Sequence, residues 1–237
     1  MSLSGTTSWS LQRDAIINAA LRKLAVLSGG SSPEAYEITN ASETLNAMIK
    51  SFQVDGMPVW KMTTYSFPTV ANTSTYTIGT GQTLNTPVPL KIIQAWRNQS
   101  TNSSNVPMNV YTNYNYNLLP TTATSGTPVN LYYQPKASSG VISVWPTPAD
   151  ANTTIYIRYQ DAFQDFNAST NDLDFPPYWT EAVIYGLAWR LAPEYGLPPQ
   201  DRADIKNEAL YFKNEALSFG TEEGSLFMQP DWSGNQR

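Results

Sequence analysis

The sequence predicts an α+β fold: helices from the N- and C-terminal parts form one helical bundle, with an inserted antiparallel β domain that is a sandwich or barrel-like. Two observations predict it. Apolar residues recur at helical spacing in both terminal parts of the chain. Between them, Thr, Tyr, Val and Ile dominate, and Pro, Gly and Asn recur every several residues, as is typical of strands and turns. An antiparallel insertion can leave and re-enter a bundle at one point.

These patterns divide the 237 residues into four segments. Residues 1–58 form an N-terminal helical hairpin, and residues 59–165 form the β domain. Residues 166–220 supply C-terminal helices that complete the bundle, and residues 221–237 form an extended tail.

The N-terminal hairpin contains two predicted helices. The first begins near Ser8 or Ser10, ends near Leu27, and has an apolar stripe: Ile16, Ala20, Leu24 and Leu27. The second begins at a capping box in which Ser31 precedes Glu34 by three residues. Its expected buried face is Ile38, Ala41, Leu45, Met48, Ile49 and Phe52.

The β domain contains seven predicted strands, at 60–67, 74–78, 88–97, 106–111, 129–134, 141–145 and 153–160. In the last of them, Ile155, Ile157 and Tyr159 alternate with polar or amphipathic residues, which indicates one buried face. Residues 98–105 (NQSTNSSN) are expected to form an exposed loop tip, because none of them can contribute to a core.

Helix returns after Asp174, with Pro176 and Pro177 fitting a first turn. One face carries Trp179, Val183, Leu187 and Leu191, and small residues would allow close helix approach: Ala182, Gly186 and Ala188. A fourth helix opens at Pro198 and Pro199. Its expected inner face is Ala203, Leu210, Lys213 and Leu217.

The composition excludes common enzyme classes. The chain has no Cys and no His, so a Ser/His/Asp or Cys/His arrangement and thiolate or imidazole metal ligands are impossible. Charged residues are only 14%, and the net charge of −5 argues against binding DNA through a basic patch. No apolar stretch reaches the roughly 18 residues of a membrane span, and the N-terminus lacks the pattern of a secretory signal. We therefore expect no catalytic residue, cofactor or metal, and no membrane partner.

Two clusters leave a functional alternative open. The carboxylates of an acidic loop could act as a pair in glycoside hydrolysis or bind a cation, or could cap a helix and hydrate the loop: Asp161, Asp165, Asp172 and Asp174. The aromatic residues of the β domain could stack on sugars, or serve as core and subunit contacts: Tyr65, Tyr76, Trp96, Tyr111, Tyr114, Tyr116, Tyr132, Tyr133, Trp145, Tyr156 and Tyr159.

The tail carries the candidate partner-binding residues Leu226, Phe227, Met228 and Trp232. Gly, Pro and polar residues are too frequent there for a helix. Exposed apolar side chains on such a segment are unfavourable in water, whereas on a partner they could act as anchors. The alternative is that the tail folds back on its own helices.

Four stretches together resemble the head-to-tail adaptor proteins of tailed bacteriophages. They are 45–60 (LNAMIKSFQVDGMPVW), 67–78 (FPTVANTSTYTI), 145–159 and 174–195. The pattern is most similar to the short-tailed phage kind called tail tubular protein A, or packaged-DNA stabilisation (tail accessory) protein.

The resemblance implies a structural virion protein that forms a ring, usually of twelve subunits, beneath the portal protein. Such a ring joins the portal to distal tail or nozzle proteins, extends the channel through which double-stranded DNA passes without specific binding, and helps retain packaged DNA. The C-terminal segment of such proteins commonly engages the portal. Assembly would take place in the bacterial host cytoplasm. The alternative function is a carbohydrate-binding or cell-wall-degrading tail component that uses the β domain.

Overall fold

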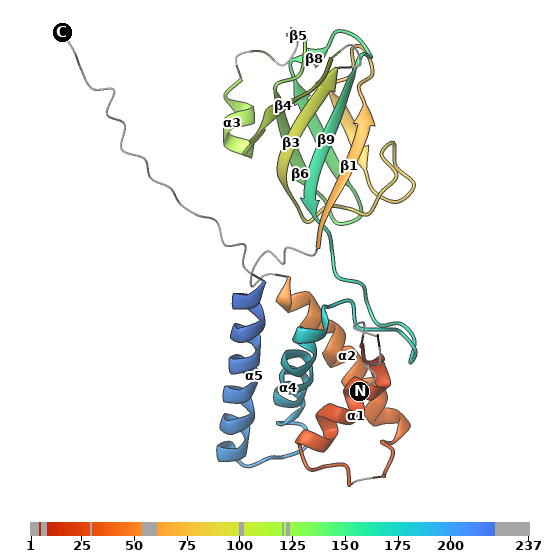
Figure 1. The fold of residues 1–237 in the computed structure, drawn as a ribbon, viewed down its shortest axis with the longest axis vertical. Helices are drawn as coiled ribbons and strands as arrows, with labels where there is room; N and C mark the ends of the chain where they lie inside the picture. The colour runs from red at the N-terminus through yellow and green to blue at the C-terminus, as the bar shows by residue number, and fades with distance from the viewer. Residues whose placement is uncertain are drawn as a thin grey trace, which may run out of the picture.

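The computed structural model describes residues 5, 9–28, 30–53, 61–99, 102–119, 121 and 124–220. Strands gather at one end of the molecule and the long helices at the other, so the α+β class is confirmed (Figure 1). We call the helices α1 (Arg13–Lys23), α2 (Ala35–Phe52), α4 (Thr180–Leu191) and α5 (Pro199–Phe219) the helical lobe. The strands between residues 62 and 160 form the β lobe.

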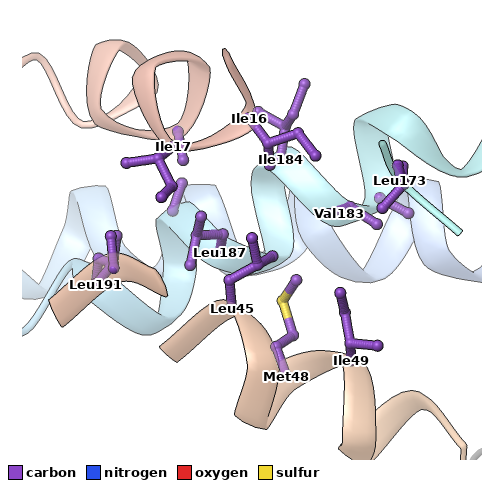
Figure 2. Packing of buried hydrophobic residues seen from close by; sticks show 14 of the residues in the cluster. Ile16, Ile17, Leu45, Met48, Ile49, Leu173, Val183, Ile184, Leu187 and Leu191 are labelled. Carbon is purple, nitrogen blue, oxygen red and sulfur yellow. The ribbon is translucent and has the colours of Figure 1, made fainter. Parts of the chain in front are cut away.

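Helix α4 lies at the centre of the helical lobe. It contacts α1, α2 and α5, and it follows directly on the short 3₁₀ helix η2 (Pro177–Trp179). Figure 2 shows Ile17, Leu45 and Leu187 converging between α1, α2 and α4. The predicted apolar faces of α1, α2 and α4 are confirmed at all but two positions. The exceptions are Ile38 and Leu27, which are only half-buried, and Leu27 lies beyond the end of α1. The other predicted residues are buried: Ile16, Ala20, Leu24, Ala41, Leu45, Met48, Ile49, Phe52, Trp179, Val183, Leu187 and Leu191. Helices from both ends of the chain therefore share one hydrophobic core.

The predicted start of α2 is wrong by one helical turn. Glu34, rather than Ser31, is the residue that precedes the helix, and its backbone N–H donates to the Glu37 carboxylate at 2.8 Å. The capping-box chemistry is thus present with two glutamates. Helix α1 likewise starts later than expected, at Arg13, because Gln12 pairs as an extended residue with Asp172.

The predicted inner face of α5 is correct only in its second half. Leu217 packs against the core and Lys213 lies over the Phe52 ring, whereas Ala203 and Leu210 are exposed. The sequence did not indicate Ala209 and Ala216, which are buried, or Phe212, which packs against the core. The helix is polar over most of its length, so its own apolar pattern is weak. The contact with α4 decides which face is covered.

All seven predicted strands are confirmed, with ends shifted by up to a few residues. They are β1 (Met62–Pro68), β2 (Thr75–Ile78), β3 (Lys91–Gln99), β4 (Asn102–Tyr111), β6 (Asn130–Pro135), β7 (Gly140–Trp145) and β9 (Thr153–Gln160). They form one sheet in the order β1-β9-β3-β4-β6-β7-β2. The sheet is mixed rather than wholly antiparallel, because β4 and β6 run parallel, with Val110 opposite Leu131.

The sheet curls so that its two edge strands approach each other. The rings of Phe67 in β1 and Tyr76 in β2 lie with centroids 5.0 Å apart, although these strands are at opposite ends of the strand order. The concave side encloses a second hydrophobic core, which includes Ile142, Ile155 and Ile157. The alternation predicted for residues 153–160 is confirmed up to Tyr159: Ile155, Ile157 and Tyr159 are buried, and Tyr156 and Arg158 are half-buried. Gln160, predicted on the other face, is buried at the end of the strand.

The polar stretch 98–105 is not simply a loop. β3 extends to Gln99 and β4 begins at Asn102, so Asn98 pairs with Asn105 in a hairpin. Backbone hydrogen bonds of an exposed ladder do not require apolar side chains. The parallel step from β4 to β6 is made by the short helix α3 (Asn113–Asn117) and by β5 (Ser125–Gly126), which pairs with β8 (Thr147–Pro148).

Candidate partner-binding surfaces

The predicted tail residues Leu226, Phe227, Met228 and Trp232 lie outside the described residues. Their role as partner anchors stays a prediction. The described part of the chain ends at Gly220, which follows α5 and donates its backbone N–H to the carbonyl of Ala216. The surfaces that the structure describes are therefore the segment between the lobes, the outside of the β lobe and the helical lobe.

The acidic segment 161–175 connects β9 to the helical lobe and is fastened to α2. Asn46 uses both ends of its amide: Nδ2 donates to the Phe166 carbonyl at 3.0 Å and Oδ1 accepts from the Phe166 N–H at 2.8 Å. Lys50 Nζ donates to the carbonyl of Phe163 at 2.8 Å and lies 2.7 Å from Asp165. The segment also pairs with the N-terminus, where Leu173 N–H donates to the carbonyl of Leu11. It is thus a structural strap across α2 and the start of α1.

Lys61 joins the entry and exit points of the β lobe. Its Nζ lies 2.5 Å from Asp174 Oδ2, and its carbonyl accepts from the Asp161 N–H at 2.9 Å. Its ammonium also lies 5.8 Å from the centre of the Phe163 ring, which stacks on Phe175 at 4.3 Å. Phe163 and Phe175 both belong to the helical core. One lysine therefore ties the β lobe to the helical core by charge and by aromatic contact.

The four aspartates of the predicted cluster each have a local structural contact. Asp161 accepts from the N–H of Ala162, and Asp172 Oδ1 lies 3.4 Å from Ser10 Oγ. Asp165 pairs with Lys50, and Asp174 pairs with Lys61 and accepts from the Gln164 N–H. The expectation that Asp174 caps the following helix is wrong, because Pro176 precedes η2 and makes no side-chain cap.

A pocket of about 400 Å³ lies over this segment, with Asp165, Asp172 and Asp174 in its wall. Within the described residues, no group of three or more acidic side chains is arranged to hold a metal ion. The sequence indicated the carboxylates but not Lys50 and Lys61, which pair with two of them, nor Asn46, which holds the backbone of Phe166. These three residues lie far away in the chain, so no local signal could have identified them.

The aromatic residues of the β lobe divide between core and surface. Tyr76 and Tyr159 are buried, and Tyr65 and Tyr133 pack against the core. On the convex face, Trp96 of β3 and Tyr156 of β9 stack in parallel, with centroids 5.5 Å apart and planes inclined by 3°. This stack is half-buried and is the strongest candidate for a sugar-stacking platform.

Two groups of large side chains are strongly exposed, and of their members the sequence had indicated only Tyr114. In α3 and just beyond it, Tyr114 is 72% exposed and Leu118 is 63% exposed. At the end of α5, Phe219 is 75% exposed and packs edge-on against Tyr178. Contiguous exposed apolar patches are typical of surfaces that bind a partner, whereas single exposed apolar side chains occur on most proteins.

The charge is divided unevenly between the two parts of the chain. Residues 62–160 contain four cations (Lys91, Arg97, Lys136 and Arg158) and a single acid, Asp150, for a net charge of +3. That leaves ten of the 14 basic and eighteen of the 19 acidic residues elsewhere, a net charge of −8. The helical part and its tail are therefore acidic, and the β lobe is weakly basic.

The described residues form an α+β protein with two separate hydrophobic cores and with large apolar side chains exposed on both lobes. No helix in the described ranges is long and apolar enough to cross a membrane. The family model of the SU10 adaptor protein matches residues 5–223. The chain belongs to the SU10 adaptor protein family, and so to the structural adaptors of bacteriophage virions. No curated protein matches the chain.

Proposed function

We propose that this adaptor forms a ring of twelve copies that joins the portal protein to the distal tail or nozzle proteins of a short-tailed phage. It would be of the kind called tail tubular protein A or packaged-DNA stabilisation protein. The observation that carries the proposal is the family match, which spans nearly the whole described chain. When one chain has two different complementary surfaces, head-to-tail contacts between copies form a closed ring if the rotation between neighbours closes.

In this proposal the helices from both ends act as one bundle that lines the DNA channel. The support is the charge division, because the helical part and its tail carry −8. An acidic lining repels phosphate, so double-stranded DNA can slide without specific binding. Twelve copies at −5 each would bring about −60 formal charges to the ring.

The tail supplies the portal contact in this proposal. Leu226, Phe227, Met228 and Trp232 combine with the acidic Glu222, Glu223 and Asp231 in a segment of 17 residues. Apolar and aromatic anchors that enter pockets of a partner contribute most of the binding energy of many interfaces. The ring would assemble on the portal in the host cytoplasm and remain in the virion at the head–tail interface, where it helps retain packaged DNA.

We propose no enzymatic activity, cofactor or metal. The second candidate function is a carbohydrate-binding or wall-degrading tail component. Two observations favour it: the Trp96–Tyr156 stack, and the pocket with Asp165, Asp172 and Asp174 in its wall. Against hydrolysis, Asp165 and Asp174 are held by lysines and Asp172 lies beside a serine hydroxyl.

The test is to mix the purified protein with the portal of the same phage and to image the product by electron microscopy. We expect a ring of adaptor subunits on one face of the portal, with Phe227→Ala and Trp232→Ala together weakening binding at least tenfold. Absence of binding at micromolar concentration would overturn the proposal. A change in Trp fluorescence with cell-wall sugars, lost in Trp96→Ala, or wall lysis lost in Asp165→Asn and Asp174→Asn, would favour the second function instead.

A further inference from the structure

An open pocket lies in the β lobe where the sheet divides. In the described pairing, β4 lies beside β3 from Ala95 to Gln99. The first four residues of β3, 91–94, pair with β9 on one side and have no partner on the β4 side. Beyond Met108, β4 turns away to pair with β6. The divergence leaves a pocket of about 430 Å³ between β3 and the end of β4, which we call the β3–β4 pocket. Its size is within the range of about 300–1,000 Å³ that is common for ligand pockets.

The lining of the β3–β4 pocket is mostly apolar. Leu90 and Val110 are each more than one-third exposed at its rim, and Ile93 and Tyr111 are half-buried in its wall. Tyr133 closes one side, with its hydroxyl donating to the carbonyl of Pro89 at 2.5 Å. The charged residue of the lining is Lys91, which is exposed. The pocket therefore combines apolar contact, a free strand edge and one positive charge.

These features suit an extended segment that carries apolar side chains and acidic neighbours. A peptide can add to a free strand edge through backbone hydrogen bonds while its alternate side chains enter pockets. The tail has this chemistry: Leu226, Phe227 and Met228 are consecutive, Glu222 and Glu223 precede them, and Pro230 ends any strand soon after. Residues 221–237 carry three acids and one arginine, whereas the β lobe carries +3.

The tail starts on the side of the helical lobe that faces the β lobe, since helix α5 ends there (Figure 1). Residues 221–225, which lead from Gly220 to the docked strand, span at most about 17 Å when extended, at about 3.3 Å per residue. A free adaptor would otherwise hold four large apolar side chains in water until the portal is present.

We infer that residues 225–229 of the C-terminal tail dock in the β3–β4 pocket as an added strand beside residues 91–94 before the adaptor meets the portal. This inference goes beyond the portal contact proposed above, because it concerns the free adaptor. The docked tail covers its own apolar anchors, and portal binding then requires its release. The same apolar side chains therefore bind the β3–β4 pocket in the free adaptor and the portal after assembly.

The chain has no cysteine, so a pair of introduced cysteines tests the contact in the full-length protein without background. The test pair is Phe227→Cys with Val110→Cys, and the matched control is Phe227→Cys with Val106→Cys. Val106 and Val110 lie on the same strand and are 37% and 36% exposed, but Val106 is not in the pocket wall. Under mild oxidation we expect a disulfide in the test pair to form at least tenfold faster than in the control. The mass of the product tells whether the tail comes from the same copy or from a neighbour, and either result supports docking.

A second measurement avoids cysteines altogether. Val110→Glu places a carboxylate in the pocket beside the acidic tail, so chymotrypsin should cleave after Phe227 severalfold faster than in the matched Val106→Glu protein. Equal cross-linking of both cysteine pairs, or equal cleavage of both glutamate variants, would overturn the inference. A third outcome would also overturn the inference: the protein self-associates, Val110→Glu abolishes this, and no cross-link to the tail forms. The pocket would then bind another surface of a second copy. Portal binding measured on the same proteins separates this failure from failure of the proposed function.

Discussion

Gly186 of α4 lies directly against the sulfur of Met48 in α2. A Cβ atom at residue 186 would stand 2.9 Å from Met48 Sδ and 3.6 Å from the ring of Phe52. This contact joins a helix from the C-terminal part of the chain to one from the N-terminal part. The small residue predicted for close helix approach is therefore used for that purpose.

Replacing this glycine should loosen the helical core. Gly186→Val adds a branched side chain at a position where even one carbon is too close to Met48, so we expect the free energy of unfolding to fall by about 1–3 kcal/mol. Urea denaturation followed by far-ultraviolet circular dichroism measures it. Ala203→Val on the exposed face of α5 is the control and should cost less than about 1 kcal/mol. Equal effects of the two variants would contradict the packing described here.

A second close approach lies in the β lobe. At Gly140 in β7, a Cβ atom would stand 2.5 Å from the Tyr133 ring and 2.9 Å from Ile78. We expect Gly140→Ala to lower the free energy of unfolding by about 1–3 kcal/mol through overpacking. Gly126→Ala is the matched control, because a Cβ there meets no heavy atom closer than 3.5 Å. Thermal unfolding of the two variants should differ by several degrees, and the absence of any difference would contradict the close packing.

The contact between Lys61 and Asp174 should limit movement of the connecting segment. Asp174→Asn removes one charge of this partly buried pair, whose side chains are 13% and 31% exposed. We expect a loss of about 1 kcal/mol and faster proteolysis within residues 161–175. Asp165→Asn is the control, since its pair with Lys50 is more exposed and should contribute less than about 0.5 kcal/mol. A larger effect of the control would mean that the pair of Lys50 and Asp165, rather than Lys61 and Asp174, holds residues 161–175 in place.

Burial raises the pKa of Tyr133 to about 12. Because the folded-state pKa lies above the usual value near 10, the folded protein holds the phenol proton more tightly than the unfolded chain does. The resulting contribution to the free energy of unfolding is complete below pH 10 and is lost as pH rises from about 10 to about 12. Tyr133→Phe removes the hydrogen bond to Pro89, so we expect the free energy of unfolding to fall by about 1 kcal/mol at pH 7. The same variant should make the free energy of unfolding depend less on pH between about 10 and 12. Denaturation at pH 7, 10 and 11.5 measures both effects. Tyr114→Phe, at a 72% exposed position, is the control and should change the free energy of unfolding at pH 7 by less than about 0.5 kcal/mol.

Local patterns were sufficient to predict most elements of the fold. The alternation of Ile155, Ile157 and Tyr159 is set by the geometry of a strand, and the spacing of Trp179, Val183 and Leu187 by that of a helix. Such signals lie within one element, so they can be read without knowing its partners. The failures fall where the signal within the element is weak, as in polar α5 and in the hairpin at residues 98–105.

The candidate surfaces were predictable only in part. The carboxylates and aromatics are visible as residue types, but whether they form a site depends on what meets them in space. Asp174 became a structural contact because Lys61, 113 positions earlier, lies 2.5 Å away. The β3–β4 pocket had no signal at all, because it arises from the point at which β4 changes partner.

By itself, the sequence determined the α+β class, the seven strands, the four long helices and the absence of His and Cys chemistry, since each depends on composition or on short-range periodicity. Only the tertiary structure decided the parallel pairing of β4 with β6, the inner face of α5, the strap over α2 and the open edge of β3. The physical reason is that these features depend on contacts between residues far apart in the chain. Their free energy is shared among several elements, and no single stretch of sequence encodes it.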